Sequence, residues 1–237
     1  MIPLRDDNPT EITPVVTVAF IVLCVLVFLY ESSLPAQMNE AFVYMYGAIP
    51  AVVFGHVQLP PELMSLPAYG TLFSSMFLHG GWMHLIGNML YLWIFGNNIE
   101  DVMGHAKFIV FYLLCGVLAA MSHALIDPTS EIPMVGASGA IAGVLGAYLL
   151  LYPHARVLVL VPYGFMGTFY IPAVLVLGLW FFMQLLSGGM SFGHEGGGVA
   201  FFAHIGGFIA GMVLIGFFKH PHVQFFNQSH SRRRSNR

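Results

Sequence analysis

A serine and a histidine, each just inside a different long apolar stretch, are the residues of this sequence best suited to chemistry. Ser138 lies in the run Gly136-Ala137-Ser138-Gly139, and His204 follows Ala203 in a later stretch. A serine hydroxyl is a weak nucleophile until a base takes its proton, and an imidazole can be that base and later act as an acid. The pair predicts attack on a carbonyl, with Ser138 as nucleophile and His204 as general base and acid.

Attack on a carbonyl also requires hydrogen-bond donors for the developing oxyanion. Backbone N–H groups around Ser138 and Gly139, at the start of a helix, are candidates. His84 and Asn88 are further candidates, because residues four apart lie on one face of a helix. No acidic residue lies near these groups in the sequence pattern. A Ser-His dyad is therefore expected, with the His204 ring oriented by packing or by a backbone carbonyl.

The composition indicates the solvent in which this chemistry would occur. The chain has 237 residues, of which 57% are hydrophobic and 8% are charged, and its mean hydropathy is +0.78. These values are typical of a polytopic membrane protein and exclude an ordinary soluble domain. Polar groups inside such a protein are costly to bury and are expected to face a cavity with a function.

Apolar runs of membrane length divide the chain into six predicted spans. They cover about 14–30, 73–95, 107–126, 137–152, 168–187 and 199–218. The fold class is therefore an all-α polytopic membrane protein, a six-helix bundle with a long structured loop over about 31–72. The predicted organisation is a cytoplasmic N-terminus over 1–13, a membrane domain over 14–218 and a basic cytoplasmic tail over 219–237.

The basic residues predict the orientation, because Lys and Arg near span ends stay on the cytoplasmic side. All eight fall in segments that an even number of spans places on one side: Arg5, Lys107, Arg156, Lys219, Arg232, Arg233, Arg234 and Arg237. Both termini are then cytoplasmic. Spans two, four and six begin at the opposite face, so His84, Ser138 and His204 are expected at one depth near the non-cytoplasmic side.

Glycines next to the two candidate catalytic residues predict close helix packing. Gly139 and Gly143 lie one turn apart in the fourth span, and Gly207 and Gly211 do so in the sixth. Small residues at this spacing let two membrane helices approach to backbone contact. Packing of these helices would bring Ser138 and His204 together.

Other chemistries lack the residues that they need. A zinc protease requires a second histidine, which the string His194-Glu195-Gly196-Gly197-Gly198 does not have. The aspartates lie in termini and loops, and Cys24 and Cys115 lie in separate spans, so neither an aspartyl site nor a disulfide is predicted. No metal or cofactor is expected. The basic tail indicates contact with anionic lipid rather than with nucleic acid.

Three stretches follow one another in a specific order. They are His79-Gly-Gly-Trp-Met-His84-Leu-Ile-Gly-Asn88, then Gly136-Ala-Ser138-Gly139 through Tyr148, then Ala203-His204-Ile-Gly-Gly207 through Gly211. Through them the chain resembles the rhomboid family of intramembrane serine proteases over essentially the whole six-span core.

The resemblance implies an activity and a role for each matching residue. Ser138 would be the nucleophile, His204 its base, His84 and Asn88 oxyanion donors, and His79 a histidine near the side of water access. The substrates would be single-span membrane proteins, admitted beside span five and the loop over 187–198. The compact six-span form resembles members from prokaryotic cell membranes.

Two positions depart from the family pattern. Where many members have a Trp-Arg pair before span two, this chain has Tyr69-Gly70-Thr71. Where many members have an aromatic residue four positions after the serine, which packs on the base, this chain has Ala142. Another residue must therefore hold the His204 ring.

Two readings from other classes compete with an enzyme. A non-catalytic rhomboid-like protein would bind membrane clients through the same lateral opening, although such relatives typically lack the serine or the histidine. A channel or transporter would use its histidines to relay protons. Its polar groups should form a path across the membrane, whereas those of this chain cluster near one face.

Overall fold

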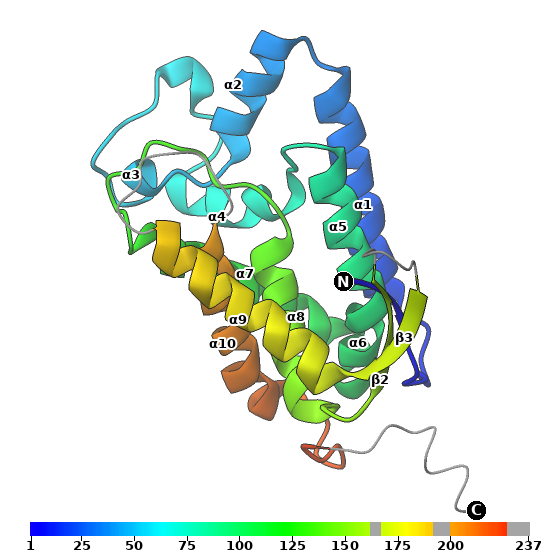
Figure 1. Cartoon of the computed structure of the whole chain (residues 1–237). Helices are drawn as coiled ribbons and strands as arrows, with labels where there is room; N and C mark the ends of the chain where they lie inside the picture. Colours follow the sequence, from blue (N-terminus) through cyan, green and yellow to red (C-terminus); the bar gives the residue numbers. More distant parts are fainter. Residues whose placement is uncertain (162–166, 192–199, 227–237) are drawn as a thin grey trace, which may run out of the picture.

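The computed structural model describes residues 1–161, 167–191 and 200–226. Figure 1 shows a bundle of helices with a small sheet beside it. The longer helices are α1 (Val15–Ser33), α2 (Ala36–Tyr46), α5 (Trp82–Tyr91), α7 (His105–Ala124), α8 (Ser138–Leu151), α9 (Ala173–Ser191) and α10 (Phe201–Phe218). Shorter helical elements are α3 (Pro50–Val53), η1 (Pro61–Leu63), η2 (Ala68–Gly70), α4 (Thr71–Ser74), η3 (Ser75–Phe77), η4 (Leu92–Gly96) and α6 (Asn97–Met103).

Within the described residues, four helices are long and apolar enough to cross a membrane. They are α1, α7, the Ala173–Met190 part of α9, and α10. Helix α8 is apolar but shorter, with 14 residues. Helix α5 continues through η4, a π-helical turn, into α6, and the residues at both junctions have right-handed helical φ and ψ. The predicted spans at 73–95 and 137–152 thus correspond to these shorter elements.

The predicted start of the second span, at residue 73, is wrong. Residues 71–77 form the short turns α4 and η3, and the continuous helix begins only at Trp82. Gly80 and Gly81 precede it, and two adjacent glycines have a low helix propensity. Because apolar residues lie on both sides of these glycines, the hydropathy pattern predicts one continuous span.

A three-stranded antiparallel sheet corrects the all-α prediction. Strand β2 (Arg156–Val161) lies between β1 (Ile2–Asp6) and β3 (Gly167–Pro172). The predicted span over 168–187 therefore begins in a strand, and its helix starts at Ala173. Thr168, Phe169, Tyr170 and Ile171 are β-branched or aromatic and favour a strand, and Pro172 cannot continue the ladder as a donor.

The chain between α1 and α5 contains α2, α3, α4 and the turns η1 to η3. In Figure 1, α2 extends from the end of α1 away from the bundle, whereas the sheet lies near the other end of α1. A β-bridge between Ala48 and Met134 ties this segment to the chain that leads into α8. The N–H of Gly136 also donates to the carbonyl of Ser75 at 2.8 Å.

Helix α8 is at the centre of the bundle. Every residue from Gly139 to Tyr148 is buried. On α10, a Cβ added to Gly207 or Gly211 would collide with the carbonyl oxygen of Gly139 or Gly143, respectively. A Cβ on Gly139 would itself come within 2.6 Å of the Ala119 side chain on α7. The backbones of α8 and α10 are therefore in direct contact, as small residues permit.

The carboxylate of Glu100 in α6 binds the start of α1. Its oxygens accept hydrogen bonds from the backbone N–H groups of Val16 at 2.9 Å and Thr17 at 2.8 Å, and from the Thr17 hydroxyl at 2.7 Å. His105 Nδ1 lies 2.6 Å from the same carboxylate. The first N–H groups of a helix lack intrahelical partners, so this completely buried carboxylate caps α1.

Candidate active site

Ser138 and His204 lie within hydrogen-bond distance. Ser138 is the first residue of α8, and His204 lies in the first turn of α10. The distance from Ser138 Oγ to His204 Nε2 is 2.8 Å. Since Gly139 and Gly207 allow the two helices to touch, residues 66 positions apart in the sequence become neighbours. This geometry allows the imidazole to take the hydroxyl proton.

The other ring nitrogen of His204 contacts a side chain that the sequence pattern does not single out. Its Nδ1 lies 2.8 Å from Oε1 of Gln184 on α9. The ring of Trp180, one turn earlier on α9, lies 5.8 Å from the His204 ring between centroids, at an interplanar angle of 36°. The sequence predicts that packing or a backbone carbonyl orients the ring. In the structure the ring packs against Trp180, and a side-chain amide takes the place of the backbone carbonyl.

Trp180 also supplies the aromatic contact to His204 that Ala142 cannot make. Ala142 is buried within α8 and its methyl group cannot cover the ring. An indole from the neighbouring helix α9 occupies one side of His204 in its place. At the other departure from the family pattern, Tyr69 lies in η2 and is 67% exposed.

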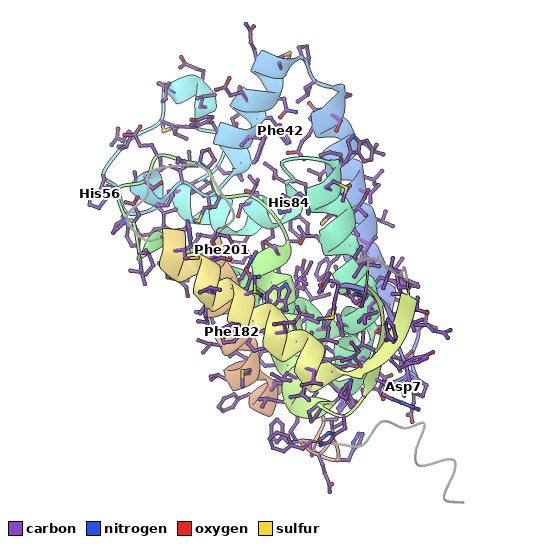
Figure 2. The ribbon with its side chains drawn as sticks, in the orientation of Figure 1. Asp7, Phe42, His56, His84, Phe182 and Phe201 are labelled. Atoms are coloured by element: carbon purple, nitrogen blue, oxygen red, sulfur yellow. The ribbon has the colours of Figure 1, made fainter. Side chains whose placement is uncertain are left out.

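His84 lies on α5 against the segment that leads into Ser138. A Cβ built on Gly136 would come within 2.7 Å of both Cε1 and Nε2 of the His84 ring. Gly136 has a φ of 124°, which L side chains rarely adopt, so glycine is required there on both counts. Figure 2 shows His84 between α5 and this segment.

The His84 Nδ1 accepts a hydrogen bond from the backbone N–H of Gly80 at 3.3 Å. In the neutral ring only one nitrogen carries a proton, so this bond leaves the proton on Nε2. Nε2 is then a donor on the side of Gly136, two residues before the serine.

Asn88 lies one turn after His84 on the same helix face. Its side chain is buried, and its Nδ2 has no hydrogen-bond partner among the described residues. The same nitrogen lies 3.7 Å from the position of a Cβ on Gly136. A buried donor without a partner is costly, and a donor next to a nucleophile is what an oxyanion requires.

His79 lies outside this group but touches it. Its ring packs edge-on against His84, with centroids 5.2 Å apart, and neither of its ring nitrogens has a protein partner among the described residues. The backbone N–H of His79 donates to Oε2 of Glu31 near the end of α1, at 3.2 Å. His79 thus contacts the site through His84 rather than through Ser138.

Most of the loop predicted to cover the site lies outside the described residues. This holds for 192–198 and for the arginines of the tail after residue 226.

The sequence did not lead to Gln184 and Trp180 as site residues, although one signal for Gln184 was available. Gln184 is the single glutamine within any of the predicted apolar spans, and a polar side chain at such a position usually has a partner.

A family model decides the classification of this chain. The model described as "Rhomboid domain" matches residues 67–221, which is more than half of the sequence. The chain belongs to the rhomboid family. With its four membrane-length helices among the described residues, it is an integral membrane protein.

Rhomboid relatives occur in bacteria and in eukaryotic organelles. "Rhomboid protein 1, mitochondrial" of Saccharomyces cerevisiae is 34% identical over 134 residues, which cover 50% of this chain and 39% of the relative. "Rhomboid protease GluP" of Bacillus subtilis is 29% identical over 202 residues, covering 85% and 35%. "Presenilin-associated rhomboid-like protein A, mitochondrial" of Danio rerio is 31% identical over 147 residues, covering 60% and 36%. The matched segments span between about a third and two fifths of these relatives.

Proposed function

We propose that this protein is an intramembrane serine endopeptidase that uses a Ser138–His204 dyad. The observation that carries the proposal is the 2.8 Å contact between Ser138 Oγ and His204 Nε2, made between two apolar helices of a rhomboid. A hydroxyl and an imidazole in this contact form a nucleophile and its base. Membership of a family that includes proteins named as proteases supports the same reaction.

The reaction proceeds through an acyl-enzyme. Nε2 of His204 takes the Ser138 proton while Oγ attacks the scissile carbonyl carbon, and the imidazolium then protonates the leaving amine as the C–N bond breaks. A water molecule, deprotonated by the same nitrogen, attacks the ester carbonyl in the second half. The Ser138 oxygen leaves with the proton, and the dyad is restored.

Four donors are arranged to stabilise the tetrahedral oxyanion. The backbone N–H groups of Ser138 and Gly139 lie in the first turn of α8, where helical N–H groups lack intrahelical partners. His84 Nε2 and Asn88 Nδ2 approach from α5 beside Gly136. We assign all four to the oxyanion, and His79 to support of the His84 ring.

Small substrate side chains at the cut fit the surroundings of Ser138. A cavity of about 40 Å³ adjoins the serine, and its lining is mostly small: Gly116, Ala119, Ala120, Gly136, Gly139, Ala140, Ala200 and Ala203 are among its residues. A methyl group fits such a space better than a long side chain. We therefore propose substrates whose membrane helix unwinds near Ala or Gly residues at its non-cytoplasmic end.

The proposed topology has six spans, with the α5–η4–α6 helix and α8 added to the four long helices. Both termini are then cytoplasmic, which follows from the positions of the basic residues. The domain bounds at 14–218 and location in a prokaryotic cell membrane are part of this proposal. Labelling of single cysteines from either side of sealed vesicles tests the topology.

The test of the activity is cleavage of a single-span reporter in proteoliposomes. Wild type is compared with Ser138→Ala and His204→Ala, with a fluorophosphonate probe to report serine reactivity without a substrate. The expected result is cleavage near the non-cytoplasmic end of the reporter helix by wild type alone. If wild type binds several reporters but neither cuts them nor reacts with the probe, a client-binding rhomboid replaces the protease.

A further inference from the structure

Helix α9 supplies two side chains to the base, although the nucleophile and the base lie on α8 and α10. Gln184 and Trp180 are four residues apart and so lie on one helix face. The amide oxygen of Gln184 is 2.8 Å from Nδ1 of His204, and Trp180 packs on the same ring. The catalytic imidazole is thus held between three helices.

We propose that Gln184 is a positioning residue that fixes the tautomer and the orientation of His204, so that Ser138 is activated only while α9 is packed against α10. This inference rests on the proposed protease function and deepens it. Gln184 touches neither Ser138 nor the oxyanion donors in any described contact, so it acts through His204.

The ability of His204 to act as a base depends on which of its ring nitrogens carries the proton. Nδ1 can donate to Gln184 Oε1 only when it is protonated. The neutral ring then has its lone pair on Nε2, the nitrogen 2.8 Å from Ser138 Oγ. Without an acceptor at Nδ1, the proton can move to Nε2, and a ring with Nε2–H cannot accept the serine proton.

An amide suits this position better than a carboxylate would. Gln184 is partly exposed on a helix whose neighbouring residues Phe182 and Met183 are 57% and 46% exposed. An unpaired charge on this lipid-facing helix would be costly. The ionisable side chains close enough to interact electrostatically with His204 are the imidazoles of His84 on α5 and His123 on α7. No carboxylate among the described residues bonds to the ring.

The same contact makes the base sensitive to the position of α9. Among the four membrane-length helices, α9 buries the smallest share of its side chains. In Figure 1 it crosses the front of α8 and α10 as an outer helix. If α9 moves outward, His204 loses both its hydrogen-bond acceptor and the indole. The reaction therefore depends, through the His204 imidazole, on α9 being packed against α10.

The experiment compares wild type with Gln184→Met, Gln184→Glu and the neighbouring control Met183→Leu. Methionine keeps the length of the side chain without the acceptor, and glutamate restores an acceptor oxygen. The rate of fluorophosphonate labelling at Ser138, and kcat and KM for the reporter, are measured for each. We expect Gln184→Met to lower labelling and kcat by about 10- to 100-fold with KM unchanged. Gln184→Glu should recover most of this loss, and Met183→Leu should match wild type.

Labelling of Gln184→Met at the wild-type rate would overturn the inference. So would an equal loss in Gln184→Glu, because an acceptor oxygen at this position would then not support His204. A second measurement needs no variant of Gln184: the 15N spectrum of histidine-labelled protein at neutral pH, with the His204 signals assigned by comparison with His204→Gln. We expect a proton on Nδ1, and a proton on Nε2 would contradict the proposal. A wild type that fails both activity assays would contradict the proposed function instead, and the spectrum would still decide the tautomer.

Discussion

The hydroxyl of Tyr148 donates a 2.6 Å hydrogen bond to Oδ2 of Asp6, joining the helix that begins at Ser138 to the first strand of the sheet. Asn98 Nδ2 donates to the same carboxylate oxygen at 2.9 Å. Asp6 is nevertheless largely desolvated, and this burial raises the pKa of Asp6 from its ordinary 3.8 to about 7. The two hydrogen bonds oppose this shift, and the charge of nearby Asp7 adds to it.

The raised pKa of Asp6 predicts a pH dependence of stability. Between pH 4 and 7 the folded protein holds a proton on Asp6 that the unfolded chain has released. The contribution of Asp6 to stability should therefore be greatest below about pH 4 and be lost as the pH rises to about 7, by an amount on the order of a few kcal/mol. The measurement is the apparent unfolding temperature in detergent micelles across this range, with wild type and Asp6→Asn compared.

Asp6→Asn should remove this contribution to the pH slope, and Asp7→Asn should keep most of it. Asp7 forms an ion pair with Arg156 at 3.2 Å and does not contact Tyr148 in any described interaction. Equal slopes in wild type and Asp6→Asn would show that another group titrates.

The contact between α8 and α10 predicts opposite effects for two glycine substitutions. Gly207→Ala places a methyl group against the carbonyl oxygen of Gly139, which is backbone and cannot turn aside. We expect a loss of about 1–3 kcal/mol and lower activity, because the dyad spans this contact. Gly178→Ala in α9 is the matched control, since nothing lies within 4 Å of its Cβ, and the helix should gain roughly 0.5–1 kcal/mol. Unfolding temperatures of both variants test the pair, and equal shifts would refute the close contact.

Asn88→Ala should separate catalysis from stability. Its Nδ2 has no partner among the described residues, so its loss removes a donor that matters only when an oxyanion forms. We expect kcat for the reporter to fall by about 100-fold while the unfolding temperature changes little. Met83→Ala, at an 81% exposed position on the same helix, is the control and should retain wild-type kcat. An unchanged kcat in Asn88→Ala would remove Asn88 from the oxyanion site.

Glu100→Ala should be strongly destabilising. The carboxylate accepts three hydrogen bonds from Val16 and Thr17, and these donors would be left buried without a partner. The expected loss is about 3 kcal/mol, measured by unfolding in mixed micelles. Glu40→Ala, at an exposed position in α2, should change stability by less than about 0.5 kcal/mol. Similar losses in the two variants would mean that α1 does not need this cap.

Hydropathy identified the long helices because a helix that crosses a bilayer needs apolar residues along its whole length. Helices α1, α7 and α10 follow the predicted apolar runs to within a few residues. The central strand was missed because an apolar run as short as 157–161 has no period that separates a strand from the end of a helix. The break before Trp82 was missed because two glycines change little in a hydropathy average taken over a membrane-length stretch.

Site residues differ in how much their own sequence reveals. Ser138 and His204 have glycines near them in the sequence, and these glycines predict the close helix packing that brings the two residues together. Gln184 has no such signal for its partner. Which residue its amide meets depends on the rotation of α9 against α10, which is set by packing across many side chains rather than by local sequence.

The start of α9 is bonded to the turn between α8 and β2. Backbone N–H groups of Ala173 and Val174 donate to the carbonyls of Ala155 and Pro153, at 2.8 and 3.0 Å, so one end of α9 is tied to the chain just after α8. Gln184 lies 11 residues further along, a lever arm of about 16 Å. A tilt of about 10° around that pivot would carry the amide roughly 3 Å, enough to part it from the imidazole while the strands stay paired. A small tilt of this one outer helix would thus be enough to leave Ser138 without an oriented base.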